Sequence, residues 1–263
     1  MKSLEEWPSL KRLDRPHLVN SERNMITFKI KIADIVLEIN AFNETTKRYC
    51  KDFLCDEESD YVITMNEEDL KNESSNSSDG HVYVNEEISA LYRKIADLLI
   101  ERNIVVFHSS AIKVNGYAYL ITARSGVGKS THTNLLKEYL KEECEYINDD
   151  KPLVAIKENE ITVYSTPWNG KERRGNNIST PLRSVIFLNR GINNTYQKVI
   201  NKQEIYINLL SQIYLPKEKT KREKALKVVD TILKRTYFYI INVNKDLDAA
   251  KMTYERIILD ETK

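Results

Sequence analysis

The stretch Ala123-Arg124-Ser125-Gly126-Val127-Gly128-Lys129-Ser130-Thr131 decides the fold that we expect for this chain. The apolar run Tyr117-Ala118-Tyr119-Leu120-Ile121 before it is typical of a buried strand, and residues 133–140 after it have the apolar spacing of a helix. A strand, a glycine-containing turn and a helix N-terminus bring several backbone N–H groups around one small volume, where the helix dipole adds partial positive charge. The stretch is therefore predicted to be a phosphate-binding loop.

The residue types in this loop indicate individual roles. Lys129 is expected to reach the β- and γ-phosphates of a nucleotide, and the Ser130 hydroxyl is expected to ligate Mg²⁺. The strict Walker A motif begins with glycine where this chain has Ala123, so the match is incomplete, and an ordinary polar strand-to-helix turn is the alternative. The flanking strand and helix favour the phosphate-binding interpretation. The residues expected to bind the nucleotide are Ser125, Gly126, Val127, Gly128, Lys129, Ser130 and Thr131.

Two adjacent carboxylates, Asp149 and Asp150, follow the next predicted strand. Such a pair can divide the work of phosphoryl transfer: one holds the metal ion that bridges the phosphates, and the other accepts the proton of the attacking hydroxyl. A simple β-turn is the alternative, because Asn and Asp are common turn residues. The position of the pair after the loop and one helix favours metal and base roles, without deciding which carboxylate takes which.

Three features in this order resemble the catalytic domain of HPr kinase/phosphorylase. They are His108 at the end of an apolar strand, the loop Ser125-Gly126-Val127-Gly128-Lys129-Ser130, and the pair Asp149-Asp150. The resemblance covers residues 104–190 and implies an α/β fold with a mixed-sheet P-loop nucleotide-binding core of the HPr kinase/phosphoenolpyruvate-carboxykinase-like type. It also implies ATP-dependent transfer to a serine-type hydroxyl, with His108 in the active site, Lys129 and Ser130 on phosphates and Mg²⁺, and one of the two aspartates as base.

The chain also departs from that family. Thr131 stands where the bacterial HPr kinases usually have an acidic residue, and Ala123-Arg124 stands where their loop begins with Gly-Asp. Residues 167–175 do not carry their second glycine-rich signature. These departures indicate a divergent relative that phosphorylates another hydroxyl, and they leave a phosphorylase activity open.

His108 also has a structural alternative. It ends an apolar strand and precedes Ser109-Ser110, so a buried histidine hydrogen-bonded to the backbone fits the same pattern. The family resemblance favours the active-site role, in which His108 orients a carboxylate or contacts the γ-phosphate. Zinc ligation is not expected, because His17, His81 and His132 form no ligand cluster with it.

Residues 166–175 are the next candidate segment. Proline and glycine predict a loop there, and Trp168 is expected to be exposed. Basic side chains in such a loop can clamp a transferring phosphoryl group, while a solvated charge run on the surface is the alternative. The candidates for contacts with phosphate, metal or acceptor are Lys171, Glu172, Arg173 and, at the end of a predicted core strand, Arg190.

Composition excludes several other classes of protein. The 40 basic and 39 acidic residues give a net charge of +1, so nothing indicates a nucleic-acid partner. The N-terminus has no apolar signal segment, and no run reaches the length of a membrane span. Cys50, Cys55 and Cys144 lack metal-ligand spacing and suit a reducing cytosol. We expect a cytoplasmic protein without a membrane partner; a homo-oligomer stays open.

The chain is expected to have two parts, a small α+β N-terminal region (residues 1–84) and an HPr-kinase-like ATP-binding catalytic domain (residues 85–263). Residues 71–80 are polar and without periodicity, which predicts a mobile loop. The other predicted elements are strands at 25–31, 34–39, 61–65, 104–107, 145–148, 153–156, 161–164, 184–190 and 237–241, and helices at 44–54, 86–101, 203–214, 217–234 and the C-terminus.

The function expected from these features is that of an ATP- and Mg²⁺-dependent kinase whose acceptor is a serine of a protein or precursor peptide. A small-molecule alcohol is the alternative acceptor, and a non-catalytic ATP-binding switch module is a different class of function. The Asp149-Asp150 pair separates these classes, because a binder needs only one metal-holding acid and no base. Carboxykinase chemistry on an oxo-acid would require a His, Lys and Asp metal-ligand set that the sequence does not assemble.

Overall fold

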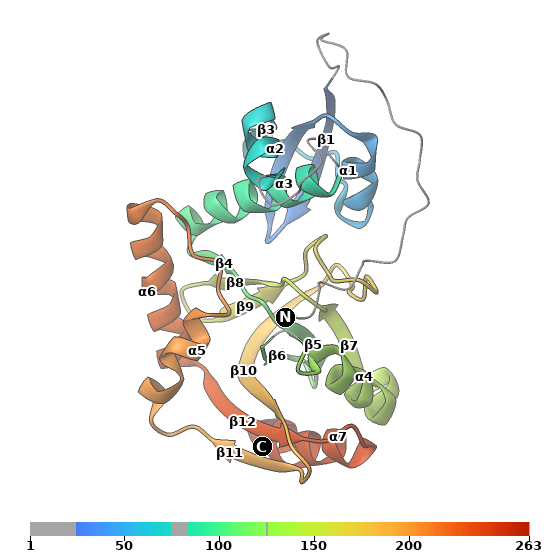
Figure 1. Ribbon diagram of the computed structural model, residues 1–263, viewed down its shortest axis with the longest axis vertical. Helices are drawn as coiled ribbons and strands as arrows, with labels where there is room; N and C mark the ends of the chain where they lie inside the picture. Colours follow the sequence, from blue (N-terminus) through green and yellow to red (C-terminus); the bar gives the residue numbers. More distant parts are fainter. Residues whose placement is uncertain (1–24, 75–83, 125, 263) are drawn as a thin grey trace.

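A three-stranded and a nine-stranded sheet organise the part of the chain that this computed structural model describes, residues 25–74, 84–124 and 126–262 (Figure 1). The predicted mixed α/β fold class is confirmed. In the described part, none of the helices combines the length and the apolar character that crossing a lipid bilayer requires. Ser125, predicted to bind nucleotide, lies outside the described residues.

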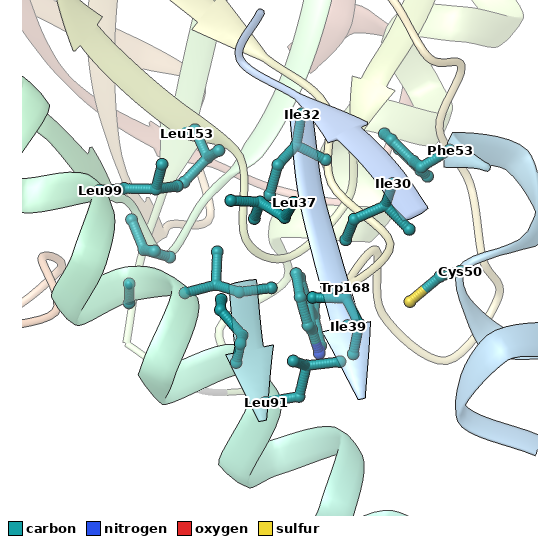
Figure 2. Packing of buried hydrophobic residues seen from close by; sticks show 14 of the residues in the cluster. Ile30, Ile32, Leu37, Ile39, Cys50, Phe53, Leu91, Leu99, Leu153 and Trp168 are labelled. Atoms are coloured by element: carbon teal, nitrogen blue, oxygen red, sulfur yellow. The ribbon is translucent and has the colours of Figure 1, made fainter. Parts of the chain in front are cut away.

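The smaller sheet has the order β1-β2-β3. Strand β1 (Ile26–Ile32) pairs antiparallel with β2 (Ile35–Ala41), and β3 (Tyr61–Thr64) runs parallel to β2. Alternate apolar side chains of β1 and β2 pack against α3 (Val84–Leu99), which presents Leu91 and Leu99 to them (Figure 2). The remaining elements of this part are α1 (Glu44–Tyr49), η1 (Lys51–Phe53) and α2 (Glu67–Ser74).

Helix α3 is fixed to the small sheet by the buried carboxylate of Glu87. This carboxylate accepts hydrogen bonds from the Phe42 backbone N–H at 2.5 Å, the Asn43 side-chain amide at 2.9 Å and the Thr46 hydroxyl at 2.5 Å. Three donors offset the cost of burying the charge. The helix therefore has a defined register against the start of α1.

The prediction of a mobile loop at residues 71–80 is wrong for its first four residues. Residues 71–74 form the last turn of α2, and the rest of that prediction lies outside the described residues. The i,i+4 pair of Glu67 and Lys71, 3.7 Å apart, supports the helix. Polarity alone predicted a loop because α2 is an exposed helix with few apolar positions.

The larger sheet has the order β4-β8-β9-β10-β6-β5-β7, and β12 pairs with both β10 and β11. Strand β10 curls between its two halves: residues 179–181 pair antiparallel with β9, and residues 184–190 lie parallel to both β6 and β12. The strands are β4 (Ile104–Val106), β5 (Ser110–Val114), β6 (Tyr117–Thr122), β7 (Cys144–Asn148), β8 (Leu153–Ile156), β9 (Ile161–Tyr164), β10 (Ser179–Arg190), β11 (Thr195–Lys198) and β12 (Tyr237–Val243). Of these, β5 and β11 are not predicted from the sequence.

Helices cover both faces of this sheet (Figure 1). The alternation along β6 places Ala118 and Leu120 in the core beneath α5 and α6, and Tyr119 and Ile121 in the core beneath α4 and α7. The chain thus forms three layers, helix, sheet and helix. The helices are α4 (Lys129–Leu140), α5 (Tyr206–Leu210), α6 (Lys219–Arg235), α7 (Leu247–Thr253) and α8 (Leu259–Thr262), with short η2 (Ile100–Arg102), η3 (Lys141–Glu143), η4 (Lys202–Ile205) and the π-helical η5 (Tyr254–Ile258).

Strand direction brings five chain segments to one edge of the larger sheet. Strands β6, β10 and β12 are parallel, and β7 has the same direction because both β6 and β7 pair antiparallel with β5. The carboxyl ends of these four strands and the amino end of β5 therefore lie at the same edge. The described residues of these five segments are 108–110, 123–124 with 126–129, 148–151, 190–191 and 243–245.

The boundary predicted at residues 84 and 85 stays a prediction. Helix α3, which begins at this boundary, packs in one core with the small sheet and also with Val106, Leu153 and Trp168 from the remainder of the chain (Figure 2). The apolar core is therefore continuous across the predicted division.

Candidate active site

The loop between β6 and α4 lies where the sequence predicts it. Gly126 and Gly128 have φ angles of 75° and 124°, which side chains with a Cβ rarely adopt. Gly128 is the N-cap residue of α4 and makes no side-chain cap, so the first N–H groups of the helix have no capping side chain. The loop therefore presents backbone donors and a helix N-terminus in the arrangement that binds anions.

Arg190 contacts this loop from the end of β10. Its Nε donates to the Val127 carbonyl at 2.8 Å, and another guanidinium nitrogen donates to the Gly126 carbonyl at 2.5 Å. Because C=O and N–H point in opposite directions in a trans peptide, these bonds set the direction of the loop amides. Arg190 thus holds the loop, and the direct contact with phosphate or acceptor predicted for it stays a prediction.

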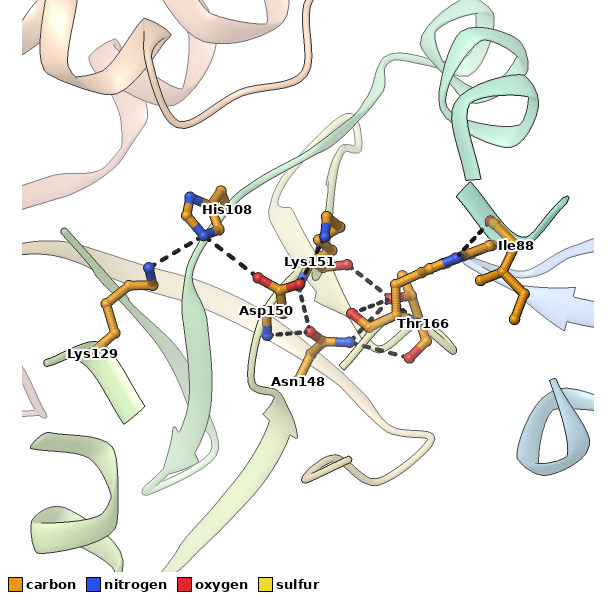
Figure 3. A network of polar contacts seen from close by, with 8 residues as sticks. Ile88, His108, Lys129, Asn148, Asp150, Lys151 and Thr166 are labelled. Carbon is orange, nitrogen blue, oxygen red and sulfur yellow. Dashed lines mark hydrogen bonds and ion pairs between the residues drawn. The ribbon is translucent and has the colours of Figure 1, made fainter. Parts of the chain in front are cut away.

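Lys129, His108 and Asp150 form a chain of contacts across the edge of the sheet (Figure 3). The Lys129 ammonium lies 3.2 Å from His108 Nε2, which lies 3.5 Å from Asp150 Oδ1. His108 is positioned by its backbone N–H, which donates to the Gln212 carbonyl at 2.6 Å. The structure therefore brings together three of the four residues predicted to be catalytic, from three separate segments.

The protonation of this chain follows from burial and charge. Burial lowers the pKa of His108, and the Lys129 ammonium lowers it further against the opposing effect of Asp150. A neutral His108 accepts a hydrogen bond from Lys129 at Nε2, so the His108–Asp150 contact is not an ion pair at neutral pH. Burial also lowers the pKa of Lys129, an effect that Asp150 and Asp149 oppose.

Asp149 faces the helix side of the same site. Its Oδ1 accepts a hydrogen bond from the Ser110 hydroxyl at 2.6 Å, and the Ser130 hydroxyl lies close enough to lower the pKa of this carboxylate. Burial raises the pKa of Asp149, whereas these two hydroxyl donors lower it. Ser110 was missed from the sequence, because the strand β5 that it begins was not predicted. Asp149 and the predicted metal ligand Ser130 are thus neighbours.

Asn148 fixes the backbone that carries the two aspartates. Its Oδ1 accepts the backbone N–H groups of Asp150 at 2.9 Å and Lys151 at 2.7 Å, and its Nδ2 donates to the Thr166 carbonyl at 3.1 Å (Figure 3). The backbone does form the Asx-type turn that was the alternative interpretation. The turn nevertheless directs both carboxylates to the site, so the two interpretations describe the same segment.

Lys151 is a further cation of this site, and its role is not apparent from the sequence alone. Its ammonium lies 2.7 Å from Asp150 Oδ2 and 5.4 Å from the ring centroid of Tyr92, on α3. An ammonium over an aromatic face is attracted by the ring quadrupole. The helix that packs on the small sheet thereby supplies one wall of the site.

The loop at 166–175 lies beside the aspartates but differs from expectation at Trp168. This side chain is 6% exposed and its indole N–H donates to the Ile88 carbonyl at 3.2 Å, so the predicted exposed tryptophan is wrong. The ring packs in the apolar core between the small sheet and α3. The composition of the loop alone does not indicate this burial. The loop packs against the aspartates at Gly170, where an added Cβ would lie 3.5 Å from the Asp150 Cβ.

The charged residues of this loop point in different directions. Arg173 stacks over the Tyr49 ring with its guanidinium carbon 4.5 Å from the centroid, and donates to the Tyr49 carbonyl at 2.8 Å. Arg174, missed from the sequence, hydrogen-bonds Asn134 of α4, pairs with Glu172, and lowers the pKa of Asp149 by its charge. Arg173 therefore anchors the loop to α1, and Arg174 is the loop cation that faces the site. Lys171 is exposed.

A cavity of about 540 Å³ lies against the predicted phosphate-binding loop. Among the described residues that line it are three cations, Lys129, Arg190 and Lys245, and no Asp or Glu. Its volume is in the range of small-molecule and cofactor pockets. The described residues that line it are Gly126, Val127, Gly128, Lys129, Ser130, Thr131, His132, Leu188, Arg190, Gly191, Val243, Asn244 and Lys245.

His132 joins α4 to α7 through the Thr253 hydroxyl, 3.0 Å from Nε2. That hydroxyl donates to the Ala249 carbonyl, so Nε2–H is the donor toward Thr253, and the buried Nδ1 is unprotonated and has no partner among the described residues. Burial lowers the pKa of His132 to about 4. The imidazole is therefore neutral in the folded protein.

Acid is expected to destabilise the fold through His132. Its pKa is about 4 in the fold against an ordinary 6.5, so the unfolded chain takes up the proton first as the pH falls through this window. The contribution of neutral His132 to the free energy of unfolding is fully present above pH 6.5. At 1.36 kcal/mol per pKa unit, about 3 kcal/mol of this contribution is lost by pH 4. Urea unfolding at pH 7 and near pH 4 should show that His132→Gln loses less stability than the unaltered protein. An equal loss in both proteins would contradict this assignment.

Comparison with known proteins shows no family for this chain. No family model matches the chain, and no curated protein matches it. Among solved structures, it is similar to the HPr(Ser) kinase/phosphatase from Coxiella burnetii, with a TM-score of 0.36 and 11% identity over 59% of this chain and 98% of that one. A similarity this weak shows neither family membership nor activity, so the function is argued from the geometry of the site.

Proposed function

We propose that this chain is an ATP- and Mg²⁺-dependent kinase of the HPr-kinase-like class, whose acceptor is a serine hydroxyl of a protein or precursor peptide. The observation that carries the proposal is the convergence of the phosphate-binding loop, the His108–Lys129–Asp150 chain and the Asp149–Ser130 pair at one edge of the sheet. An anion site alone would not need two carboxylates beside it. Phosphoryl transfer needs one acid for the metal and one for the proton.

The contacts of the two aspartates support different roles. Asp149 lies beside Ser130, whose hydroxyl lowers its pKa and is the group that a P-loop supplies to Mg²⁺, so we assign Asp149 to the metal side. Asp150 contacts His108 and Lys151 instead, so we assign it as the general base. Half-buried His108 stays neutral and accepts from the Lys129 ammonium at Nε2, so it holds this cation close to the Asp150 carboxylate.

The donor atoms present fit Mg²⁺. A serine hydroxyl and one or two carboxylates are the oxygen ligands that this ion takes in nucleotide sites, where phosphate oxygens and water complete its coordination. When bound, the ion would neutralise charge on the β- and γ-phosphate oxygens.

The proposed reaction assigns a task to each residue. The acceptor oxygen forms a bond to the γ-phosphorus while the bond from that phosphorus to the β–γ bridging oxygen breaks, and ADP leaves with the electron pair. The Asp150 carboxylate takes the acceptor proton. Lys129 and the loop amides stabilise the charge that spreads over the phosphate oxygens, the term that dominates phosphoryl-transfer catalysis.

An acceptor screen tests the proposal. Purified protein is incubated with γ-labelled ATP and MgCl₂ over an array of serine and threonine peptides, and separately with a panel of small alcohols. Label on serine peptides is the expected result. Label only on small alcohols would overturn the acceptor class, and nucleotide binding without transfer to any acceptor or to water would favour the switch module.

Removal of Arg174 is expected to lower kcat/KM for transfer about tenfold or more, because groups that orient a metal ligand contribute on this scale. Arg173→Ala is the matched control, since Arg173 faces Tyr49 and not Asp149. ADP release with a fixed acceptor measures both variants. The larger effect should come from Arg174→Ala, and an equal or reversed order would contradict the assignment of Arg174 to the site.

A further inference from the structure

The cavity beside the phosphate-binding loop extends along the carboxyl ends of β10 and β12. Leu188 and Val243, both buried, give it an apolar wall, and Lys245 follows directly after β12. In open α/β sheets, ligands bind outside the carboxyl ends of parallel strands. The position of this cavity is therefore that of a ligand site and not of a packing defect.

Strand order gives the cavity a direction relative to the catalytic residues. In the order β12-β10-β6-β5-β7, the loop follows the central strand β6. Asp149 and Asp150 follow β7, which lies two strands from β6 on one side. Lys245 follows β12, which lies two strands from β6 on the other side. At the usual strand spacing, each of these strand ends is about 10 Å from the end of β6. A nucleotide held at the loop with its γ-phosphate toward Asp150 must point its nucleoside toward β12.

The charges on the cavity wall suit the phosphate next to the nucleoside. Arg190 already binds the Gly126 and Val127 carbonyls. Lys245 has no hydrogen-bond or ion-pair partner among the described residues. The nearby Asp246 carboxylate accepts from the Asn244 amide at 2.9 Å and does not line the cavity. Lys245 is therefore the cation left to bind an anion there.

We propose that this cavity is the subsite for the nucleoside end of the nucleotide and that Lys245 binds the α-phosphate. Leu188 and Val243 would then contact the apolar surface of the ribose and base. This inference rests on the proposed function, because it takes the loop to hold the β- and γ-phosphates. It adds a nucleotide-binding residue from a strand end far from the loop in sequence.

Calorimetric titration with MgADP tests Lys245. A charge-assisted hydrogen bond at a partly exposed site predicts that Lys245→Gln raises the Kd for ADP about tenfold, whereas Lys245→Arg keeps most of the affinity. Lys251→Gln is the matched control, an exposed lysine of α7 that does not line the cavity. Pyrophosphate, which has no α-phosphate, should bind Lys245→Gln and the unaltered protein with Kd values within about twofold of each other.

Photolabelling with 8-azido-ADP tests the direction. The label is expected on residues 188–191 or 243–245. Label on residues 108–110 or 168–175, or an unchanged Kd for ADP in Lys245→Gln, would overturn the subsite while leaving the kinase proposal standing. Failure of the unaltered protein to bind either ADP or pyrophosphate would instead overturn the proposed function itself.

Discussion

Asp150→Asn is expected to lower the kcat of phosphoryl transfer by about 10²–10⁴-fold, the usual contribution of a general base, with little change in the Kd for ADP. Asparagine keeps the size of the side chain and can still contact His108 and Lys151, but it cannot accept the acceptor proton. Label transfer from ATP to the peptide found in the acceptor screen measures kcat, and titration with ADP measures binding.

Asp149→Asn separates the metal role from the base role. If Asp149 holds Mg²⁺ with Ser130, Asp149→Asn should need a higher Mg²⁺ concentration for half-maximal rate. Asp150→Asn should reach its half-maximal rate at the same Mg²⁺ concentration as the unaltered protein. Normal turnover by both variants would mean that Asn148 and the two aspartates form only a structural turn. A Mg²⁺ effect in Asp150→Asn alone would exchange the two roles.

Lys129→Ala is expected to lower kcat by about 10²–10³-fold, the range for removing one donor from a preorganised charge-stabilising site. The ammonium lies beside His108 and the predicted phosphate-binding loop, where it can stabilise negative charge on the β- and γ-phosphate oxygens. ADP release with acceptor present measures the loss. Lys227→Ala, on the exposed face of α6, is the matched control.

The same variant has a second readout that does not depend on catalysis. The Lys129 charge is one of the causes that lower the pKa of His108, so Lys129→Ala should raise this pKa. The sign follows because removal of a nearby cation makes imidazolium less unfavourable. A proton NMR titration of the histidine ring signals measures the shift. A full-rate Lys129→Ala enzyme would contradict the assignment of the loop.

Local sequence was sufficient for the strand, turn and helix that carry the predicted phosphate-binding loop. The apolar run at 117–121, the two glycines and the apolar spacing at 133–140 predicted β6, the turn and α4. Each of these signals depends on backbone conformation and on side-chain periodicity, which neighbouring residues determine. The aspartate pair at the end of β7 was visible for the same reason.

Local sequence was not sufficient for residues whose position depends on partners far along the chain. Trp168 is buried because α3 and the small sheet leave an apolar space for it. Arg173 and Arg174 are adjacent in sequence, yet one stacks on Tyr49 and the other faces Asp149. No pattern within the loop distinguishes them, since both are arginines of the same short charged stretch, residues 171–174.

The sequence by itself thus determined the strand, the glycine-containing turn and the helix of the predicted phosphate-binding loop, and the position of the carboxylate pair, because these features depend on local chemistry. Only the tertiary structure decided that Ser110, Arg174 and Lys245 join them. Strand order and direction place the ends of β6, β7, β10 and β12 and the start of β5 at one edge. This order is selected by the packing of apolar faces between distant segments, a property of the whole chain that short-range periodicity does not contain.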